Sequence, residues 1–309
     1  MGRNAKTAGP EPLCRLIRFS ATDGLDLTGL LYEPKRQTKR AVVFLHGTGG
    51  ASIFGMRRTN LLAAEFVRRG FAWFPFNNRG AGLIARLRKR DKSVPGGAAH
   101  ERIRECVADI DGVAGELRRR GYRELFLVGH STGANKIAVY DHYKPRNPFR
   151  RYVFLGGGDD TGLAYDKFGA ARFRRTLEKA REMIRARRGR EIVPPRLTDV
   201  LELGPLSWIS LYDLLNPDGD YNVFPFLEAM RGVRLSRRPR FRHLRGVRKP
   251  SLALWGEHDE FCYDDVPGCV SVLSQVVGAN FELGIVADTE HGFGGKEGEL
   301  GSLIAEWLA

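Results

Sequence analysis

A serine between two glycines is the first pattern in this sequence that could carry out chemistry. The segment FLVGHSTGANK (126–136) runs from an apolar stretch, through a G-x-S-x-G pattern centred on Ser131, into a helix-forming stretch. This pattern works where a strand turns sharply into a helix, because the serine then takes a strained backbone conformation that only small neighbours permit. The context predicts a nucleophile elbow that presents the Ser131 hydroxyl at a helix N-terminus, where backbone N–H groups favour developing negative charge.

A serine nucleophile needs a general base, and His291 is the best placed of the seven histidines. It lies in ADTEHGFGG, directly after an apolar predicted strand, and the glycines give this loop the freedom to bring an imidazole across the sheet edge. His46 and His130 end two other predicted strands, and His258 adjoins an acid candidate. The three remaining histidines lie in no motif, so we predict His291 as the base.

The imidazole in turn needs a carboxylate that orients it. Asp259 follows an apolar predicted strand in LALWGEHDE, in a Gly-x-x-Asp turn, and is the favoured acid. Five other aspartates are alternatives, in chain order. The first two follow the strand after the serine, the next two stand at the start of a predicted helix, and the last lies three residues before His291. These alternatives are Asp159, Asp160, Asp264, Asp265 and Asp288.

Backbone amides for an oxyanion hole are available at two places. FLHGTGG (44–50) ends an apolar predicted strand with small residues, so the N–H group of Thr48 is free to point at a substrate oxygen. The second N–H group is that of Thr132, directly after the nucleophile. A phosphate-binding loop is the alternative interpretation, but the sequence contains neither G-x-x-x-x-G-K-[ST] nor G-x-G-x-x-G.

Apolar runs that alternate with helical patterns predict an α/β protein. Residues 13–34 read as a hairpin that turns at Asp23-Gly24. Helical patterns cover about 52–69, 99–120, 132–143, 266–277 and 296–308, and buried strands are predicted at 41–47, 71–76, 124–130, 151–158, 251–256 and 281–288. Buried strands alternating with amphipathic helices indicate a mostly parallel, doubly wound sheet with both faces covered.

The segment 159–249 interrupts this alternation, since it has no clear strand. It holds an Arg-rich helical pattern at about 167–188 and the aromatic stretch 208–226. We expect an inserted helical cap at 159–249 on a core made of 1–158 and 250–309. Five aromatic residues of the cap could either wall an acyl pocket or fasten the cap to the core: Trp208, Tyr212, Tyr221, Phe224 and Phe226.

The charge is strongly positive, with a formal net charge of +14. Between Asp166 and Lys249 there are 20 basic and 10 acidic residues. Because no nucleic-acid module is present, we expect a solvated surface and no nucleic-acid partner. No run of apolar residues is long enough for a membrane span, the N-terminus lacks an apolar signal segment, and four scattered cysteines suit buried thiols in a reducing compartment. These features predict a cytoplasmic protein.

The motifs HGTGG, GHSTG, GEHDE and the His291 loop, in this order, resemble those of the α/β-hydrolase superfamily. The resemblance implies the α/β-hydrolase fold, a Ser131–Asp259–His291 triad, and no metal or organic cofactor. NNRGAG (77–82) is similar to the D-x-R-G-x-G segment of many members, with Asn77 where aspartate is usual. GHSTGANK and the cap end NVFPF are similar to bacterial relatives of the siderophore-esterase-like group.

These observations predict a serine hydrolase for a small-molecule acyl substrate, working through an acyl-enzyme intermediate. A carboxylic ester is the favoured substrate class. An amidase, a thioesterase or a C–C bond hydrolase could use the same triad. A non-catalytic protein that binds an acidic partner through the basic cap is the alternative from another class. The serine nucleophile disfavours epoxide hydrolase and dehalogenase chemistry, for which the resemblance would imply an aspartate.

Overall fold

The computed structural model describes residues 13–49, 51–55 and 57–309. Two of the expectations above concern residues that are not described. The N-terminus without a signal segment falls on residues 1–12, and the glycine-rich loop FLHGTGG includes Gly50. The chain forms an eight-stranded sheet with the order β1-β2-β4-β3-β7-β8-β9-β10. Its strands are β1 (Cys14–Ser20), β2 (Asp26–Tyr32), β3 (Arg40–Leu45), β4 (Ala72–Asn77), β7 (Glu124–His130), β8 (Phe149–Leu155), β9 (Ser251–His258) and β10 (Phe281–Glu290).

Strand pairing confirms the predicted fold class. β1 pairs antiparallel with β2 and β2 with β4, whereas every pair from β4 to β10 is parallel. The predicted hairpin is β1–β2, and its turn contains Gly24 at a φ of 85°. The helices of this core are α1 (Arg57–Arg68), α2 (Cys106–Arg119), α3 (Thr132–Tyr143), α7 (Val266–Ser274) and α8 (Glu297–Leu308).

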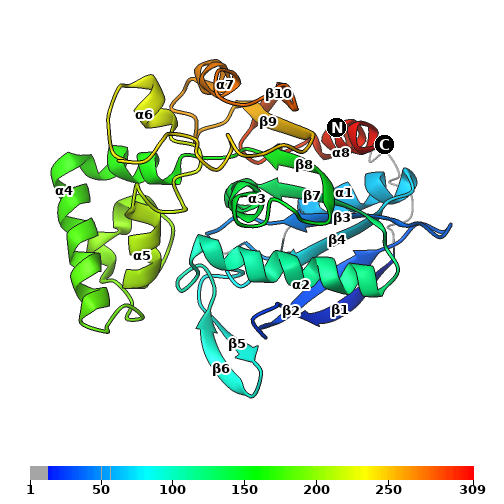
Figure 1. Ribbon diagram of the computed structural model, residues 1–309, viewed down its shortest axis with the longest axis horizontal. Coiled ribbons are helices and arrows are strands. Elements are labelled where there is room, and N and C mark those ends of the chain that lie inside the picture. Colours follow the sequence, from blue (N-terminus) through cyan, green and yellow to red (C-terminus); the bar gives the residue numbers. More distant parts are fainter. Residues whose placement is uncertain (1–12, 50, 56) are drawn as a thin grey trace, which may run out of the picture.

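Alternate residues of the central strands supply the two halves of the core. In β3, Val43 packs with α2 and α3 on one face, and Val42 and Phe44 pack with α1 and α8 on the other. The α2 and α3 helices cross in front of the sheet in Figure 1. Because both faces are covered, the strands read as near-continuous apolar runs, which is why their positions could be predicted.

The hairpin of β5 (Ala85–Lys89) and β6 (Lys92–Gly96) was not predicted. It forms its own two-stranded sheet below the main one in Figure 1. Its sequence ARLRKRDKSVPG is charged at half of its positions, and only one side of the ribbon, with Leu87 and Val94, is partly buried. A strand pair that buries so few apolar side chains shows too little apolar alternation to give the usual strand signal.

Residues 159–249, all described, contribute helices and no strand of the central sheet. They form α4 (Asp160–Arg185), α5 (Trp208–Leu215) and α6 (Phe226–Met230), with two short 3₁₀ turns between α4 and α5. α4 and α5 lie together beside the sheet, at the left of Figure 1. α4 is kinked at Gly169, whose φ of 69° breaks the helix. Among the described residues no helix is long and apolar enough to cross a bilayer.

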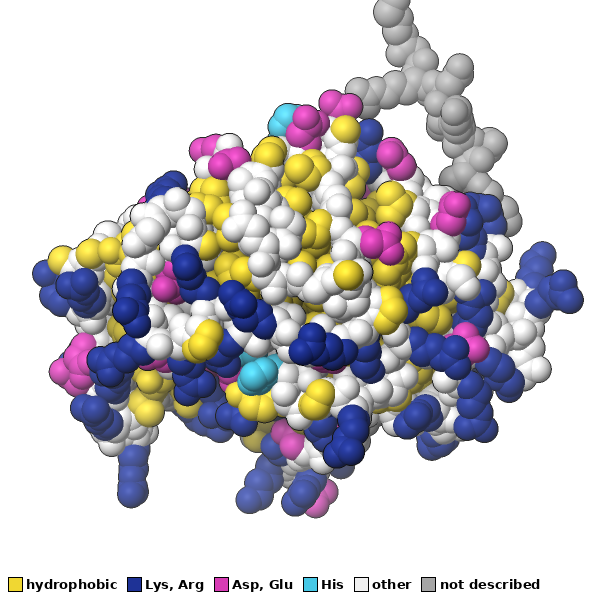
Figure 2. All heavy atoms as spheres, turned by 45° about the horizontal axis from the view of Figure 1, so that its top comes forward, with side chains coloured by type: hydrophobic (Ala, Val, Ile, Leu, Met, Phe, Trp, Pro, Cys, Tyr) yellow, Lys and Arg dark blue, Asp and Glu magenta, His cyan; other side chains and the backbone are white. Residues whose placement is uncertain are grey.

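Many arginines of this segment are exposed and pair with acids of their own helix or turn. Arg181 bonds Glu178 and Arg188 bonds Glu191, each at 2.7 Å. Figure 2 shows one face of the molecule, with Lys and Arg side chains over much of its lower part and apolar atoms in its upper middle. Exposed ion pairs of this kind add little to the free energy of unfolding. The arginines of this segment therefore mainly make the protein surface positive.

The thiols are all free, and three of the four are buried: Cys106, Cys262 and Cys269. The expectation of buried thiols is wrong for Cys14, which is exposed at the start of β1. Cys14 lies on the face of β1 whose side chains are exposed, whereas Ile17 and Phe19 on the other face are buried.

Asp213 of α5 joins the inserted segment to the core and gives a pH prediction. Its carboxylate accepts a hydrogen bond of 2.7 Å from the backbone N–H of Ile103, and burial raises its pKa from 3.8 to about 7. The folded state therefore binds more protons than the unfolded state between these two values, so this group stabilises the fold at low pH and that contribution is lost as the pH rises through about 7.

We expect Asp213→Asn, which keeps the acceptor oxygen but cannot ionise, to be more stable than the wild type at pH 8 by about 1–3 kcal/mol. Urea unfolding of both proteins at several pH values between 5 and 8 measures the difference. A difference that does not change with pH would contradict the assignment.

Candidate active site

The backbone at Ser131 has the strained conformation that the sequence predicts. Ser131 lies between β7 and α3 with a φ of 57° and a ψ of −130°. A Cβ atom at Gly129 would lie 2.3 Å from the Gly133 carbonyl oxygen, and one at Gly133 would lie 2.2 Å from that of Leu45. Both glycines are therefore required by close backbone approach, as expected for a nucleophile elbow.

His291 and Asp259 are in direct contact. The Nδ1 atom of His291 lies 3.0 Å from both carboxylate oxygens of Asp259. Asp259 is 2 % exposed and His291 is 8 % exposed, so the pair is shielded from water. A carboxylate at Nδ1 leaves Nε2 as the nitrogen that can accept a proton.

Backbone contacts connect the histidine loop to the serine. The Nε2–H group of His130, the neighbour of Ser131, donates to the carbonyl oxygen of His291 at 2.9 Å. The N–H of His291 donates to Glu260 at 3.1 Å, and the Phe261 ring packs edge-on against the imidazole at 4.5 Å between ring centres. The loops after β7, β9 and β10 therefore meet at one place.

Most of the alternative acids have other roles. Asp159 caps α4 through the N–H of Gly162 and also accepts from Leu227 and Tyr263. Asp265 caps α7 through Gly268, as a helix-start residue should. Asp264 is next to it, and Asp288 is an exposed residue of the irregular end of β10.

Asp160 has no such structural role. Its carboxylate accepts one hydrogen bond, of 3.1 Å, from Asn135, which lies one helical turn beyond Ser131. Burial and the neighbouring Asp159 raise its pKa to about 7, and His291 is close enough to oppose that shift. Asp160 therefore lies beside the candidate site but does not contact the imidazole.

The two predicted oxyanion donors lie on either side of Ser131. A Cβ atom at Gly47 would lie 2.9 Å from the Ser131 Cβ, so the loop before Thr48 passes directly over the serine. Thr132 is the first residue of α3, where backbone N–H groups have no partner within the helix. Among the described residues neither the Thr48 nor the Thr132 N–H group has a hydrogen-bond acceptor.

A chain of buried polar side chains, which was not predicted from the sequence, leads away from this loop. The Nδ1 atom of His46 is 2.7 Å from the Gly47 carbonyl oxygen, and its Nε2 accepts from the N–H of Asn78 at 3.3 Å. The Asn78 side chain accepts from Lys136 at 3.2 Å, and Lys136 bonds Glu101 at 2.6 Å. Burial and the charge of Lys136 lower the pKa of His46 to about 3, so His46 stays neutral and is not a second base.

The Lys136–Glu101 ion pair at the end of this chain gives a stability prediction. Both side chains are almost completely buried. We expect Glu101→Gln to lower the free energy of unfolding by about 3–5 kcal/mol, because Lys136 then keeps a buried charge without a counter-ion. Urea unfolding measures the loss.

The double variant Glu101→Gln with Lys136→Met is the matched control. It removes both charges, so it should recover most of the stability that the single variant loses. If the double variant is as unstable as the single one, the loss comes from altered packing and the electrostatic explanation is wrong.

Asn77, which stands where related sequences usually have aspartate, makes two hydrogen bonds with its side chain. Its Oδ1 accepts from the N–H of Ile53 at 2.8 Å, and its Nδ2 donates to the Ser52 hydroxyl at 3.2 Å. The amide thus supplies one acceptor and one donor to residues 52 and 53. Arg79 of the same segment bonds Asp109 at 2.7 Å and Asp23 at 3.2 Å, which ties the first hairpin to α2.

Two of the aromatic residues predicted for the cap pack against the core. The rings of Phe224 and Phe226 pack against Trp255 of β9 at 6.2 and 6.3 Å. Trp208 is buried, and Tyr212 lies against Arg181 of α4. Tyr221 differs, since its hydroxyl lies beside the Thr132 side chain, and burial together with the negative charge of Asp160 raises its pKa.

The comparisons with known proteins agree on the fold. The family described as "Serine aminopeptidase, S33" matches residues 36–186. The α/β-hydrolase GrgF from Penicillium sp. sh18 has a TM-score of 0.65 at 16% identity, over 96% of this chain and 98% of that one. A monoglyceride lipase variant from Saccharomyces cerevisiae has a TM-score of 0.62 at 16% identity, over 100% and 98%.

A carboxylesterase from Bacillus subtilis has a TM-score of 0.53 at 14% identity, over 96% of this chain and 91% of that one. None of the curated proteins matches the chain in sequence. The matched segment contains β3, the serine elbow and β8, and the solved structures extend the likeness over nearly the whole chain. The chain thus has the α/β-hydrolase fold, and its residues 36–186 match the S33 family.

Proposed function

We propose that this protein is a carboxylic ester hydrolase that forms an acyl-enzyme at Ser131. The observation that carries the proposal is the His291–Asp259 contact of 3.0 Å beside a serine held at a φ of 57°. A base with its orienting acid, next to a strained serine, is the arrangement that nucleophilic acyl transfer requires. The esterases and the lipase among the similar structures support the ester class.

In the proposed mechanism the Ser131 hydroxyl attacks the acyl carbon while Nε2 of His291 takes its proton. Asp259 holds Nδ1–H and stabilises the imidazolium that forms. The N–H groups of Thr48 and Thr132 bind the oxyanion of the tetrahedral intermediate. His291 then protonates the leaving alcohol. In the second half it takes a proton from the water that attacks the acyl-enzyme, and it returns this proton to the Ser131 oxygen as the acid is released.

Residues 159–249 form the cap in this proposal. They begin directly after β8 and reach the site through Asp160 and through Tyr221, which lies beside Thr132. These two residues, with Phe261 against the imidazole, are the side chains we expect beside the acyl group. The free thiols fit a reducing, cytoplasmic location, which is also part of the proposal.

Labelling with a fluorophosphonate probe tests the nucleophile. The probe phosphonylates an activated serine, so we expect the wild type to be labelled and Ser131→Ala to remain unlabelled. A folded wild type that does not react would refute the proposal. Initial rates with an ester, a thioester and an amide of the same acyl group then decide between the ester class and the alternatives, among them the peptidase activity that the matched family's description suggests.

A further inference from the structure

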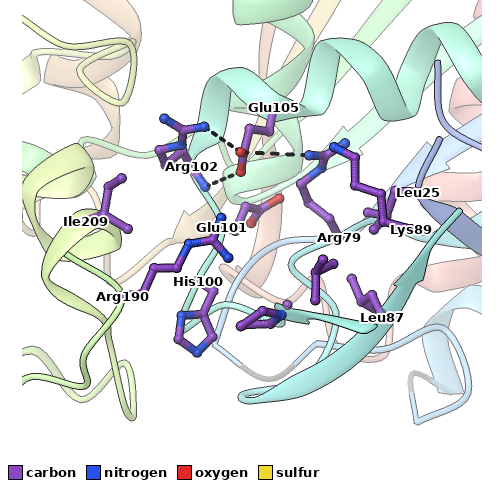
Figure 3. A pocket seen from close by; sticks show the side chains of 13 residues that line it. Leu25, Arg79, Leu87, Lys89, His100, Glu101, Arg102, Glu105, Arg190 and Ile209 are labelled. Atoms are coloured by element: carbon purple, nitrogen blue, oxygen red, sulfur yellow. Dashed lines mark hydrogen bonds and ion pairs between the residues drawn. The ribbon is translucent and has the colours of Figure 1, made fainter. Parts of the chain in front are cut away.

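A cavity of about 220 Å³ lies away from the candidate site, where the β5–β6 hairpin faces the inserted segment. Its walls come from the hairpin, from residues 100–105, and from Arg190 and Ile209 of the inserted segment. Ser131, Asp259 and His291 do not line it. Figure 3 shows Ile209 and Leu87 on opposite sides, with the Arg190 side chain reaching in toward Glu101.

Of the described basic side chains that line the cavity, three are already paired with acids and one is available to a ligand. Arg79 and Lys89 are bonded to Asp23, and Arg102 is bonded to Glu105 at 2.7 Å. Among the described residues Arg190 has no hydrogen-bond or ion-pair partner, and it lines the cavity from the segment after α4.

The acids of the cavity are already paired. Glu101, on the floor, is held by Lys136 at 2.6 Å, and Glu105 is held by Arg102. His100 adds a polar group rather than a charge, because burial and the charge of Arg190 lower its pKa. The Nδ1 atom of His100 is buried and lacks a hydrogen-bond partner among the described residues.

The rest of the lining is apolar. Side chains from the first hairpin turn, from both strands of the small hairpin and from α5 contribute carbon surface: Leu25, Leu87, Val94, Pro95 and Ile209. A ligand that fits must therefore be small, carry apolar surface, and bring a single negative charge. A phosphate dianion would meet only one unpaired cation and would leave the apolar wall unused.

We propose that this cavity is a second ligand site, for a small monocarboxylic acid. The carboxylate pairs with the guanidinium of Arg190, and the apolar body lies between Leu87 and Ile209. Arg is suited to this role because its planar fork matches both oxygens of a carboxylate. The site is independent of the proposed catalysis, so its test needs no turnover.

Isothermal titration calorimetry with benzoate tests the site, with neutral benzamide as the matched ligand. We expect the wild type to bind benzoate, and Arg190→Gln to bind it about tenfold more weakly because a charge-assisted pair is lost. Benzamide should bind the wild type as weakly as benzoate binds the variant. The control Arg175→Gln removes an exposed arginine of α4 that does not line the cavity and should bind benzoate like the wild type.

A second variant locates the binding. Val94→Trp fills the cavity from β6 and should abolish the part of benzoate binding that depends on Arg190. Arg190 is exposed and unpaired, so Arg190→Gln keeps its fold and decides the question even if Val94→Trp does not fold. Undiminished binding in Arg190→Gln, equal binding of benzamide, or no wild-type binding up to about 10 mM would each overturn the proposal.

Discussion

Ser131→Ala should lower kcat for an activated ester, such as p-nitrophenyl butyrate, by about 10⁵- to 10⁶-fold. The side chain that forms the covalent bond is then absent, and His291 has no hydroxyl to deprotonate. KM should change little, because the hydroxyl contributes to the transition state rather than to ground-state binding. Steady-state rates at saturating substrate, with circular dichroism to confirm the fold, measure the effect.

Ser271→Ala provides the matched control, since it removes an exposed hydroxyl of α7 that is remote from the β7–α3 turn. Its rates should equal those of the wild type. If Ser131→Ala kept more than about 1 % of the wild-type kcat after careful purification, another group would be the nucleophile. The residual rate of a true Ser131→Ala protein should still exceed that of water, because the Thr48 and Thr132 amides remain in place.

The sequence could predict those parts of the molecule that depend on local sterics or on apolar periodicity. Gly129 and Gly133 are needed because a Cβ atom at either position would lie within 2.3 Å of a backbone carbonyl oxygen, and that requirement appears as a five-residue pattern. The buried strands appear as apolar runs for the same local reason. The hairpin β5–β6 could not be found in this way, because Leu87 and Val94 alone on its two described strands are apolar side chains packed against the core, and both are only partly buried.

The polar groups behind the candidate site could not be predicted, because they come from distant parts of the chain. Lys136 is a lysine in an otherwise apolar part of α3, and its position could have suggested a buried partner. Nothing local indicates that Glu101, 35 positions away, is this partner. The same holds for Asp160, whose place near His291 depends on the path of the loop after β8.

Asp259→Asn should lower kcat by about 10⁴-fold. Asp259 accepts a hydrogen bond from Nδ1–H of His291, and the unprotonated Nε2 then faces the substrate side. The amide of asparagine would offer its NH₂ group to Nδ1 and favour the other tautomer, which carries its proton on Nε2. That imidazole cannot take the proton of Ser131, and the charge that forms on it during the reaction has no carboxylate beside it.

The competing acids provide the controls for this prediction. Asp288→Asn changes an exposed residue and should leave kcat within about twofold of the wild type, as expected for a surface substitution. Asp160→Asn changes the carboxyl that lies near the imidazole without touching it, so its loss should stay within about 10²-fold. A larger loss in Asp160→Asn than in Asp259→Asn would make Asp160 the acid. The contact of 3.0 Å on both carboxylate oxygens is the physical reason to expect the opposite order.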